Sequence, residues 1–440
     1  MELTRESFLT QYPPLNVMNK KNIENIWEKE LFHLYVHIPF CVQKCDFCYY
    51  KSFTLKKPQL VEDYLDVLKT EIKMYARMPQ IQCKQVRSIY FGGGTPTILS
   101  ETQISEIMGL ILESFDIHNE CEICFEVRPG KELTKNKLKL LKALGINRIS
   151  IGCQSTDDEI LKINGRNLEY QDFLTSYHDI REVGFRVVNV DIMSGMVKQS
   201  FESWDSTIRE IIRLGPENIA IYKLEIYLNN QLYRRFRKGR LSMTNNAEEA
   251  RYFRHGMKQL LNADYIMTDN FTFVKDRSLD HIHRRRTWMG EDMLGVGLSA
   301  HSCFNDIIFQ NEPSLQEYMQ KIKSDVLPIF RSHINTQNEV IRQRIIFGIK
   351  NLYLSRQKIY EEFGIDCIDL FGDEFKRLED MKLIKVFDDH IETTSEGTIF
   401  ADDIVRVFFL PEHQDKMLAH VSRDKFSVVC EGETAHDKIQ

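Results

Sequence analysis

The stretch YVHIPFCVQKCDFCYY (residues 35–50) joins a β-branched and aromatic run to three closely spaced cysteines. The run is typical of a buried strand, and the cysteines follow it on a loop at its carboxyl end. The spacing Cys41-x-x-x-Cys45-x-x-Cys48 lets three thiolates bind three irons of a cubane and leaves the fourth iron open for a substrate. The sequence therefore predicts that Cys41, Cys45 and Cys48 hold a [4Fe–4S] cluster.

A zinc site is the alternative for the same three cysteines. Structural zinc takes four ligands, and the nearby candidate for the fourth is His37. Cys121 and Cys124 form a further C-x-x-C pair, but they lie on a strand-like run at the period of the strand. We expect these two cysteines, and Cys153, to be core residues.

The composition is that of a folded protein without a membrane span. The chain has 440 residues, of which 42% are hydrophobic and 28% charged, and its ten cysteines come without an apolar signal segment in residues 1–30. No apolar run approaches the roughly 20 residues that a spanning helix needs. A net charge of −6 gives no sign of nucleic-acid binding. We expect a cytoplasmic monomer with reduced thiols that acts on a small molecule.

Six strand-like runs alternate with amphipathic helical stretches from residue 34 onward, which predicts parallel strands with crossover helices. Six units are too few for a closed eight-unit barrel, so the expected fold is an α/β, partial (β/α)6 barrel. Its ligands should lie at the carboxyl ends of the strands. The predicted strands are LYVHIP (34–39), VRSIYF (86–91), EICFEV (122–127), NRISIG (147–152), FRVVNVDIM (185–193) and NIAIYKLEI (218–226).

The chain after the barrel has a different pattern. Three helical segments and a short hairpin around Asp388 and Asp389 suggest a winged-helix-like domain. The predicted divisions are an N-terminal extension (1–33), the partial barrel (34–275), a connecting segment that flanks the substrate opening (276–337), the winged-helix-like domain (338–411) and a tail (412–440).

A series of motifs in order along the chain resembles the HemN-like branch of the radical S-adenosylmethionine (SAM) superfamily, named for oxygen-independent coproporphyrinogen III dehydrogenase. The resemblance implies a radical SAM barrel with a HemN-type C-terminal domain. The motifs that follow the cysteine stretch are YFGGGTPTIL (90–99), FEVRPG (125–130), GINRISIGCQS (145–155), INGR (163–166), NVDIMSGM (189–196), IAIYKLEIY (219–227) and LGVGLSAHS (294–302).

The resemblance implies two cofactors, a [4Fe–4S] cluster and SAM. The cluster reductively cleaves SAM to give methionine and a 5′-deoxyadenosyl radical. An electron donor such as flavodoxin or ferredoxin supplies the electron. Tyr35 and Glu126 are implied as catalytic residues. The implied SAM contacts are Tyr35, Gly93, Gly94, Thr95, Glu126, Gln154, Arg166 and Asp191. Glycines suit that position because, without a Cβ, they allow close backbone approach.

Residues around the predicted site carry weaker signals. Phe40 and Phe47 are expected to pack over the cluster and keep water away from it. The basic clusters RRFRKGR (234–240) and HIHRRR (281–286) are compatible with substrate carboxylates or phosphates, and equally with solvated helix faces. His281, His283 and Trp288 lie in the same region, where they could line the substrate opening.

Three functions share this architecture, and departures from each pattern separate them. Tyr50 stands where the porphyrinogen dehydrogenases carry a further cysteine, and DFCYY replaces the PYCDF of the heme chaperones. INGR, DIMSGM and IYKLEIYLNN most resemble class C radical SAM methylases and cyclopropanases. The expectation is therefore that two SAM molecules act together to methylate or cyclopropanate an sp² carbon of a natural product or quinone. The alternatives are coproporphyrinogen III decarboxylation and heme delivery.

Overall fold

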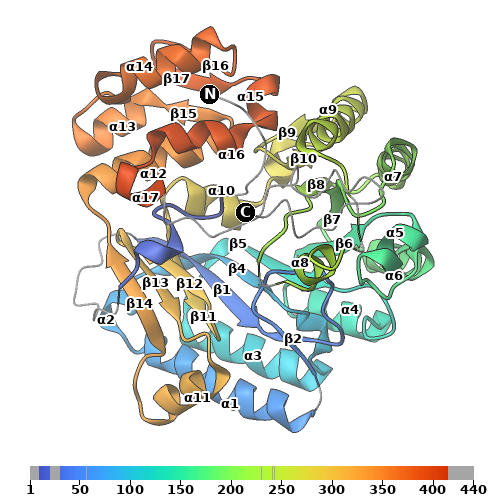
Figure 1. Cartoon of the computed structure of the whole chain (residues 1–440). Helices are drawn as coiled ribbons and strands as arrows, with labels where there is room; N and C mark the ends of the chain where they lie inside the picture. The colour runs from blue at the N-terminus through green and yellow to red at the C-terminus, as the bar shows by residue number, and fades with distance from the viewer. Residues whose placement is uncertain are drawn as a thin grey trace.

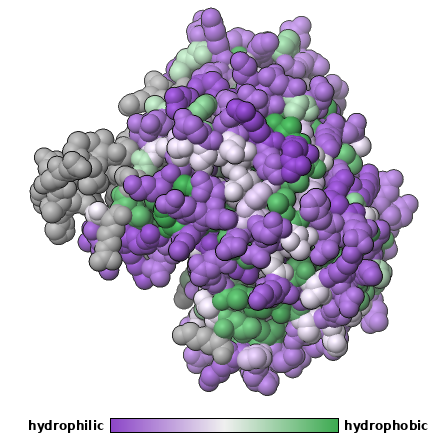
Figure 2. All heavy atoms as spheres, turned by 90° about the vertical axis from the view of Figure 1, so that its right-hand side faces the viewer, coloured by the Kyte–Doolittle hydropathy of each residue, from purple (hydrophilic) through white to green (hydrophobic). Residues whose placement is uncertain are grey.

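The computed structural model of the chain describes residues 9–19, 30–55, 57–228, 230–239, 241 and 243–414. Its centre is a 12-stranded sheet in the order β14-β13-β12-β11-β1-β4-β5-β6-β7-β8-β10-β9, with helices around it (Figure 1). Among the described residues, no helix is long and apolar enough to cross a membrane. The face shown in Figure 2 is largely hydrophilic, and its hydrophobic side chains gather in smaller patches.

Neighbouring parallel strands form the partial barrel, and each of the six predicted runs forms one of them. A further parallel strand, β11, pairs with β1 on its other side. The parallel strands are β1 (Leu31–Ile38), β4 (Gln85–Gly93), β5 (Asp116–Val127), β6 (Arg148–Gln154), β7 (Val187–Ser194), β8 (Asn218–Lys223) and β11 (Asp292–Val296).

Alternation along each strand separates the outer core from the barrel interior. In β1, Phe32, Leu34 and Val36 are fully buried in the main hydrophobic core, whereas His33 and Tyr35 make polar contacts on the other face. The covering helices are α1 (Gln59–Ala76), α3 (Glu101–Ser114), α4 (Lys135–Ala143), α6 (Tyr170–Val183), α7 (Phe201–Leu214) and α9 (Asn246–Asn262). The interior face is therefore left for polar chemistry.

The segment 276–337, predicted as a connector, instead continues the central sheet. After β11, three antiparallel strands extend the sheet: β12 (His301–Phe304), β13 (Ile307–Asn311) and β14 (Ile329–Ile334). On the opposite edge, β10 (Thr272–Val274) and β9 (Ile266–Met267) are also antiparallel. The pattern of β11 was weak because the strand is short and contains Gly295, where a Cβ would lie 2.2 Å from the His301 carbonyl oxygen.

The C-terminal domain has the element order of a winged helix, with the sheet order β15-β17-β16. Its predicted hairpin around Asp388 and Asp389 is β16 and β17. The elements are α12 (Gln337–Lys350), β15 (Tyr353–Ser355), α13 (Arg356–Phe363), α14 (Cys367–Asp380), β16 (Ile384–Val386) and β17 (His390–Thr393). Short helices follow, of which α16 (Ala401–Ile404) returns toward the barrel (Figure 1).

The start of the chain packs on this second domain. Leu9 and Tyr12 belong to the hydrophobic core of the C-terminal domain, and Gln343 Nε2 donates to the Tyr12 carbonyl oxygen at 2.7 Å. Most of the predicted tail, residues 415–440, lies outside the described residues, as do residues 1–8 and 20–29 of the predicted extension. The described part of the extension therefore helps to join the two domains.

Candidate active site

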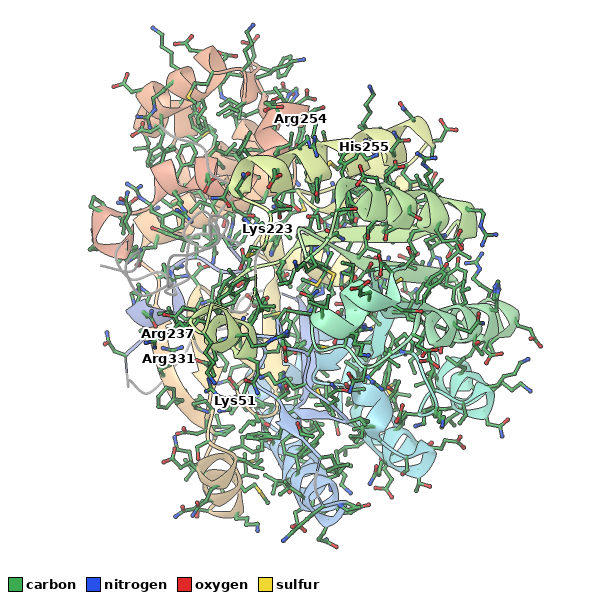
Figure 3. The ribbon with its side chains drawn as sticks, turned by 45° about the vertical axis from the view of Figure 1, so that its right-hand side comes forward. Lys51, Lys223, Arg237, Arg254, His255 and Arg331 are labelled. Atoms are coloured by element: carbon green, nitrogen blue, oxygen red, sulfur yellow. The ribbon has the colours of Figure 1, made fainter. Side chains whose placement is uncertain are left out.

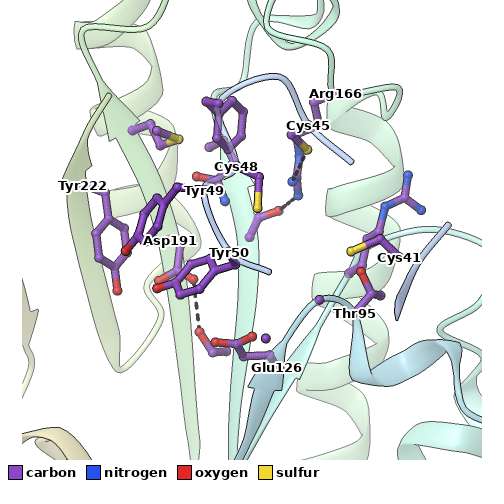
Figure 4. Close-up of a pocket in the computed structure, with 18 of the residues that line it drawn as sticks. Cys41, Cys45, Cys48, Tyr49, Tyr50, Thr95, Glu126, Arg166, Asp191 and Tyr222 are labelled. Atoms are coloured by element: carbon purple, nitrogen blue, oxygen red, sulfur yellow. Dashed lines mark hydrogen bonds between the residues drawn. The ribbon is translucent and has the colours of Figure 1, made fainter. Parts of the chain in front are cut away.

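A cavity of about 310 Å³ lies at the carboxyl ends of the barrel strands, where the fold predicts ligands. It is lined by the ends of β4 to β8 and by residues of the cysteine loop 41–50. Figure 4 shows the cysteine side chains and Arg166 on one side of this space, Tyr49 and Tyr222 on the other, and Glu126 below. The cavity also reaches Asp402 of the C-terminal region.

The three predicted cluster ligands all line this cavity. Cys41 ends the short strand β2 (Phe40–Cys41), and a turn closed by Cys48 N donating to the Cys45 carbonyl oxygen at 3.1 Å places the other two. None of the three is in a disulfide. Burial raises the pKa of Cys41 and raises the pKa of Cys48 to about 12. These two thiols are protonated at neutral pH, so cluster assembly must release their protons.

The zinc alternative fails at its fourth ligand. His37 Nδ1 lies 2.9 Å from Tyr35 Oη, and His37 Nε2 lies 3.0 Å from the Lys51 carbonyl oxygen, so both ring nitrogens are engaged. Burial lowers the pKa of His37 to about 4. Within the described ranges, no three His, Cys, Asp or Glu side chains are placed to hold one metal ion. A cubane takes each thiolate at a different iron, and this donor set fits it.

Two half-buried carboxylates form the floor of the cavity. Tyr90 Oη donates to Glu126 Oε1 at 2.5 Å. Asn189 Nδ2 and Ser150 Oγ donate to Asp191 at 2.7 and 3.2 Å. Burial raises the pKa of Glu126 to about 7 and that of Asp191 to about 6, and the hydrogen bonds and nearby Arg284 and Arg166 offset the effect at Asp191 only in part. A cationic ligand such as the sulfonium and ammonium groups of SAM would satisfy both.

The glycine motif ties the end of β4 to the cysteine loop. Gly94 N donates to the Ile38 carbonyl oxygen at 2.8 Å, and Thr95 N donates to the Phe40 carbonyl oxygen at 2.7 Å. A Cβ on Gly94 would lie 2.6 Å from that Phe40 oxygen. Gly93, Gly94 and Thr95 all line the cavity, so the motif brings backbone close to the predicted cluster.

Replacement of Gly93 by alanine should destabilise the protein. Gly93 has φ +106°, and its Cβ would lie 2.5 Å from the His37 ring, which is held by hydrogen bonds. We expect Gly93→Ala to lower stability by about 2 kcal/mol or more and to reduce the apparent unfolding temperature. Gly109→Ala is the control: it lies in α3 with nothing within 4 Å, and should stabilise by about 0.5–1 kcal/mol. Equal unfolding temperatures for the two variants would contradict this.

Gln154 and Arg166 lie where the resemblance predicts, beside the cysteines. Gln154 has a positive φ of 70° at an irregularity of β6, and Arg166 Nη2 donates to the Gly152 carbonyl oxygen. Arg166 Nη1 is 3.9 Å from Cys45 Sγ. Both side chains line the cavity, which is compatible with the predicted role for a ligand carboxylate and ribose.

The cavity lining does not support the predicted SAM contact of Tyr35. Its hydroxyl meets His37, and its ring stacks on Tyr90 at 5.9 Å, so Tyr35 lies behind the lining. Phe40 is also displaced from its predicted place, because it is fully buried against Tyr64 rather than over the cluster. Phe47 does line the cavity.

The second basic cluster (281–286) is largely ion-paired, and Arg235 of the first is ion-paired too. Arg235 pairs with Asp46 of the cysteine loop at 2.5 Å and also donates to the Ile163 carbonyl oxygen at 2.6 Å. Arg284 and Arg286 pair with Asp269 and Glu291. Figure 3 shows Lys223 toward the middle of the molecule and Arg237 nearer its edge. Arg235 therefore braces the cluster loop.

His281, His283 and Trp288, predicted as possible lining of the substrate opening, are absent from the cavity wall in the part of the chain that the structure describes. His283 Nδ1 lies 2.8 Å from Ser88 Oγ in the barrel interior, and Trp288 packs between Phe271 and Phe347. Helix α10 (Ile282–Trp288) contacts β4, whose Tyr90 lines the cavity, so these residues support the site from behind its wall.

Several lining residues were missed from the sequence. Tyr49 and Tyr50 stack at 4.4 Å and are 40% and 49% exposed in the cavity wall. At the far end lie Lys223, Glu225, Asn270, Phe271 and Asp402. The segment IYKLEIY gave a signal for the first two of these, but the others come from segments that only tertiary structure brings together.

Comparison with known proteins agrees with this site. The family model described as "Radical SAM superfamily" matches residues 35–211, which contain the three cysteines, Glu126 and Asp191. The chain contains a radical SAM domain. Its cofactors are a [4Fe–4S] cluster and SAM, and the cavity residues described above fit both.

The relatives of this radical SAM enzyme extend over both domains. The heme chaperone HemW of Bacillus subtilis is 28% identical over 377 residues, covering 85% of this chain and 98% of that protein. The oxygen-independent coproporphyrinogen III oxidase of Escherichia coli is 27% identical over 404 residues, covering 89% and 88%. The structure titled coproporphyrinogen III oxidase (HemN) from Escherichia coli superposes with a TM-score of 0.79 at 26% identity, covering 91% and 96%.

These comparisons overturn the expected class C alkylation with a second SAM. The full-length relatives are coproporphyrinogen oxidases and heme chaperones. The motifs that suggested alkylation have a structural role: Asn164 of INGR bonds Val197, next to DIMSGM, through its side-chain oxygen at 3.1 Å and its side-chain nitrogen at 3.1 Å. Hydrogen bonds that join two loops do not indicate a binding site for a second SAM.

Proposed function

We propose that this radical SAM enzyme acts on a tetrapyrrole and oxidatively decarboxylates propionate side chains of a porphyrinogen. The observation that supports it most is the match to HemN over 96% of that chain, combined with a cavity that is lined by the barrel and also by Asp402 of the C-terminal region. Structural similarity to HemN over the barrel alone would support only the function of SAM cleavage. Here the part of the cavity beyond the cysteines is also shared between the two domains.

The cavity lining contains residues that could bind the cofactors and cationic side chains that could bind an anionic substrate. Cys41, Cys45 and Cys48 would hold the cluster, and Glu126 and Asp191 would pair with the cationic groups of SAM. When bound, these cofactors supply a carbon radical that takes one hydrogen atom from the substrate. The cationic side chains in the lining are Lys44, Arg128, Arg166 and Lys223.

In the proposed reaction the hydrogen leaves the propionate carbon next to the ring. The bond to the carboxylate then breaks, CO₂ departs, and one electron passes to an external one-electron acceptor, which leaves a vinyl group. Tyr49, Tyr50 and Tyr222 surround this space with aromatic surface, which keeps water away from a reactive carbon.

The test is anaerobic incubation of the reconstituted enzyme with SAM, reductant, a one-electron acceptor and coproporphyrinogen III. We expect vinyl-bearing product, CO₂ and 5′-deoxyadenosine, and none of these with the Cys41→Ala protein. Unchanged coproporphyrinogen would overturn the proposal.

Heme delivery is the second candidate, favoured by Tyr50, which stands in place of the cysteine expected of the porphyrinogen dehydrogenases, and by the match to 98% of HemW. The same preparation incubated with heme separates the two. Stoichiometric heme retention without formation of 5′-deoxyadenosine from coproporphyrinogen would favour delivery.

A further inference from the structure

The far end of the cavity is built where the barrel meets the C-terminal domain. Lys223 ends β8, Glu225 follows it, Asn270 and Phe271 precede β10, and Asp402 comes from α16. All five line the cavity, and none of them belongs to the cysteine loop 41–50. None of them belongs to the set predicted to hold SAM, so this end is available for the substrate.

Asp402 is fixed in place and in turn fixes Asn270. Lys350 Nζ pairs with Asp402 Oδ1 at 2.6 Å, and Leu9 N donates to the same oxygen at 3.0 Å. Asn270 Nδ2 donates to Asp402 Oδ2 at 3.3 Å. A carboxylate accepts only from the nitrogen side of the amide, so Asn270 Oδ1 must point elsewhere.

Two acceptors at this end lack a donor. No described residue donates a hydrogen bond to Asn270 Oδ1 or to Glu225 Oε1, although both atoms are buried. Tyr227 Oη donates to Glu225 Oε2, and Lys223 Nζ lies 3.8 Å from Glu225 Oε1, beyond hydrogen-bond distance. Buried acceptors of this kind are usually satisfied, so this pair indicates a ligand that brings N–H or O–H donors.

We propose that Glu225 and Asn270 receive pyrrole N–H groups of the substrate, which rests on the tetrapyrrole function proposed above. A porphyrinogen carries an N–H on each of its four pyrrole rings, whereas in heme the nitrogens bind iron and carry no hydrogen. The acceptor pair therefore selects a metal-free tetrapyrrole. Tyr222 and Phe271, with ring centroids 5.0 Å apart, supply an apolar wall beside it.

The test compares two probes that share all peripheral groups: coproporphyrin III, which has inner N–H groups, and its zinc complex, which has none. Binding is measured anaerobically by absorbance and fluorescence titration of the cluster-loaded protein with SAM present. Glu225→Gln replaces a charged acceptor by a neutral one, and Asn270→Leu removes its acceptor. We expect each to weaken coproporphyrin III about tenfold or more and to leave the zinc complex within about twofold.

Glu113→Gln, on an exposed face of α3, is the matched control and should bind both probes as the wild type does. Equal loss of both probes in Glu225→Gln and Asn270→Leu would mean a merely structural role and overturn the inference, as would unchanged binding of coproporphyrin III. SAM affinity of the variants separates misfolding from a local effect. If the wild type binds neither probe, the tetrapyrrole function itself fails.

Discussion

Alanine at Cys41, Cys45 or Cys48 should abolish the iron–sulfur cluster. Each thiolate anchors one iron, and all three line one cavity. We expect about four irons and four sulfides in the anaerobically reconstituted wild type and close to none in each variant. Iron and sulfide analysis, together with electron paramagnetic resonance of the reduced protein, measures this.

Cys124→Ala is the matched control. Cys124 is fully buried in the barrel wall on β5 and is absent from the cavity lining. It should keep the whole cluster and lose only packing. If Cys124→Ala lost its iron while Cys41→Ala retained it, the ligand assignment would be wrong.

SAM affinity should fall as the pH drops through about 7, because Glu126 must be ionised to pair with a cation and burial has raised its pKa to about 7. Above that pH the carboxylate is charged and affinity should be constant. Below it, each pH unit should cost up to about tenfold, and more once Asp191, with a pKa of about 6, also takes up a proton.

Glu126→Gln should remove the upper part of this pH dependence and weaken SAM binding at about pH 8 by tenfold or more, since a charge-assisted contact is lost. Equilibrium dialysis of SAM at several pH values measures both effects. Glu132→Gln, which pairs with Arg128 outside the carboxylate floor, is the control. A Glu126→Gln protein with the affinity and pH profile of the wild type would remove Glu126 from the SAM site.

The part of the fold that sequence predicted is the part with strong periodicity. The six barrel strands are β-branched runs between long amphipathic helices, and the winged-helix domain has regular helices before a hairpin. Strands β11 to β14 were not predicted from the sequence because they are short and three of them are antiparallel. In addition, β11 pairs with β1, from which it is separated by about 250 residues of sequence. Pairing at that separation leaves no local pattern.

The residues of the site also fall into a group that could be predicted from the sequence and a group that could not. The cysteines and the residues at strand ends were predictable because parallel strands gather their carboxyl ends at one edge. Tyr35 is not part of the cavity lining, because strand alternation gives the face of a side chain but not its depth. Glu225 and Asn270 come from the barrel and Asp402 from the C-terminal domain, and no spacing along the chain signals that the three line one cavity.

The expectation of alkylation failed for a related reason. INGR and DIMSGM resemble motifs of the class C enzymes, but in this structure Asn164 and Val197 join the two loops by hydrogen bonds. A motif that holds two loops together is compatible with many reactions. The discriminating residues are those of the cavity wall, and these lie outside the motifs.

The central claim, radical chemistry on a tetrapyrrole propionate, is tested most directly by the fate of one hydrogen. Coproporphyrinogen III deuterated at the propionate carbons next to the rings is turned over anaerobically with unlabelled SAM, and 5′-deoxyadenosine is analysed by mass spectrometry. We predict one deuterium in the nucleoside and vinyl groups in the product, because the hydrogen is taken from that carbon. Unlabelled 5′-deoxyadenosine formed alongside intact propionates would contradict the account.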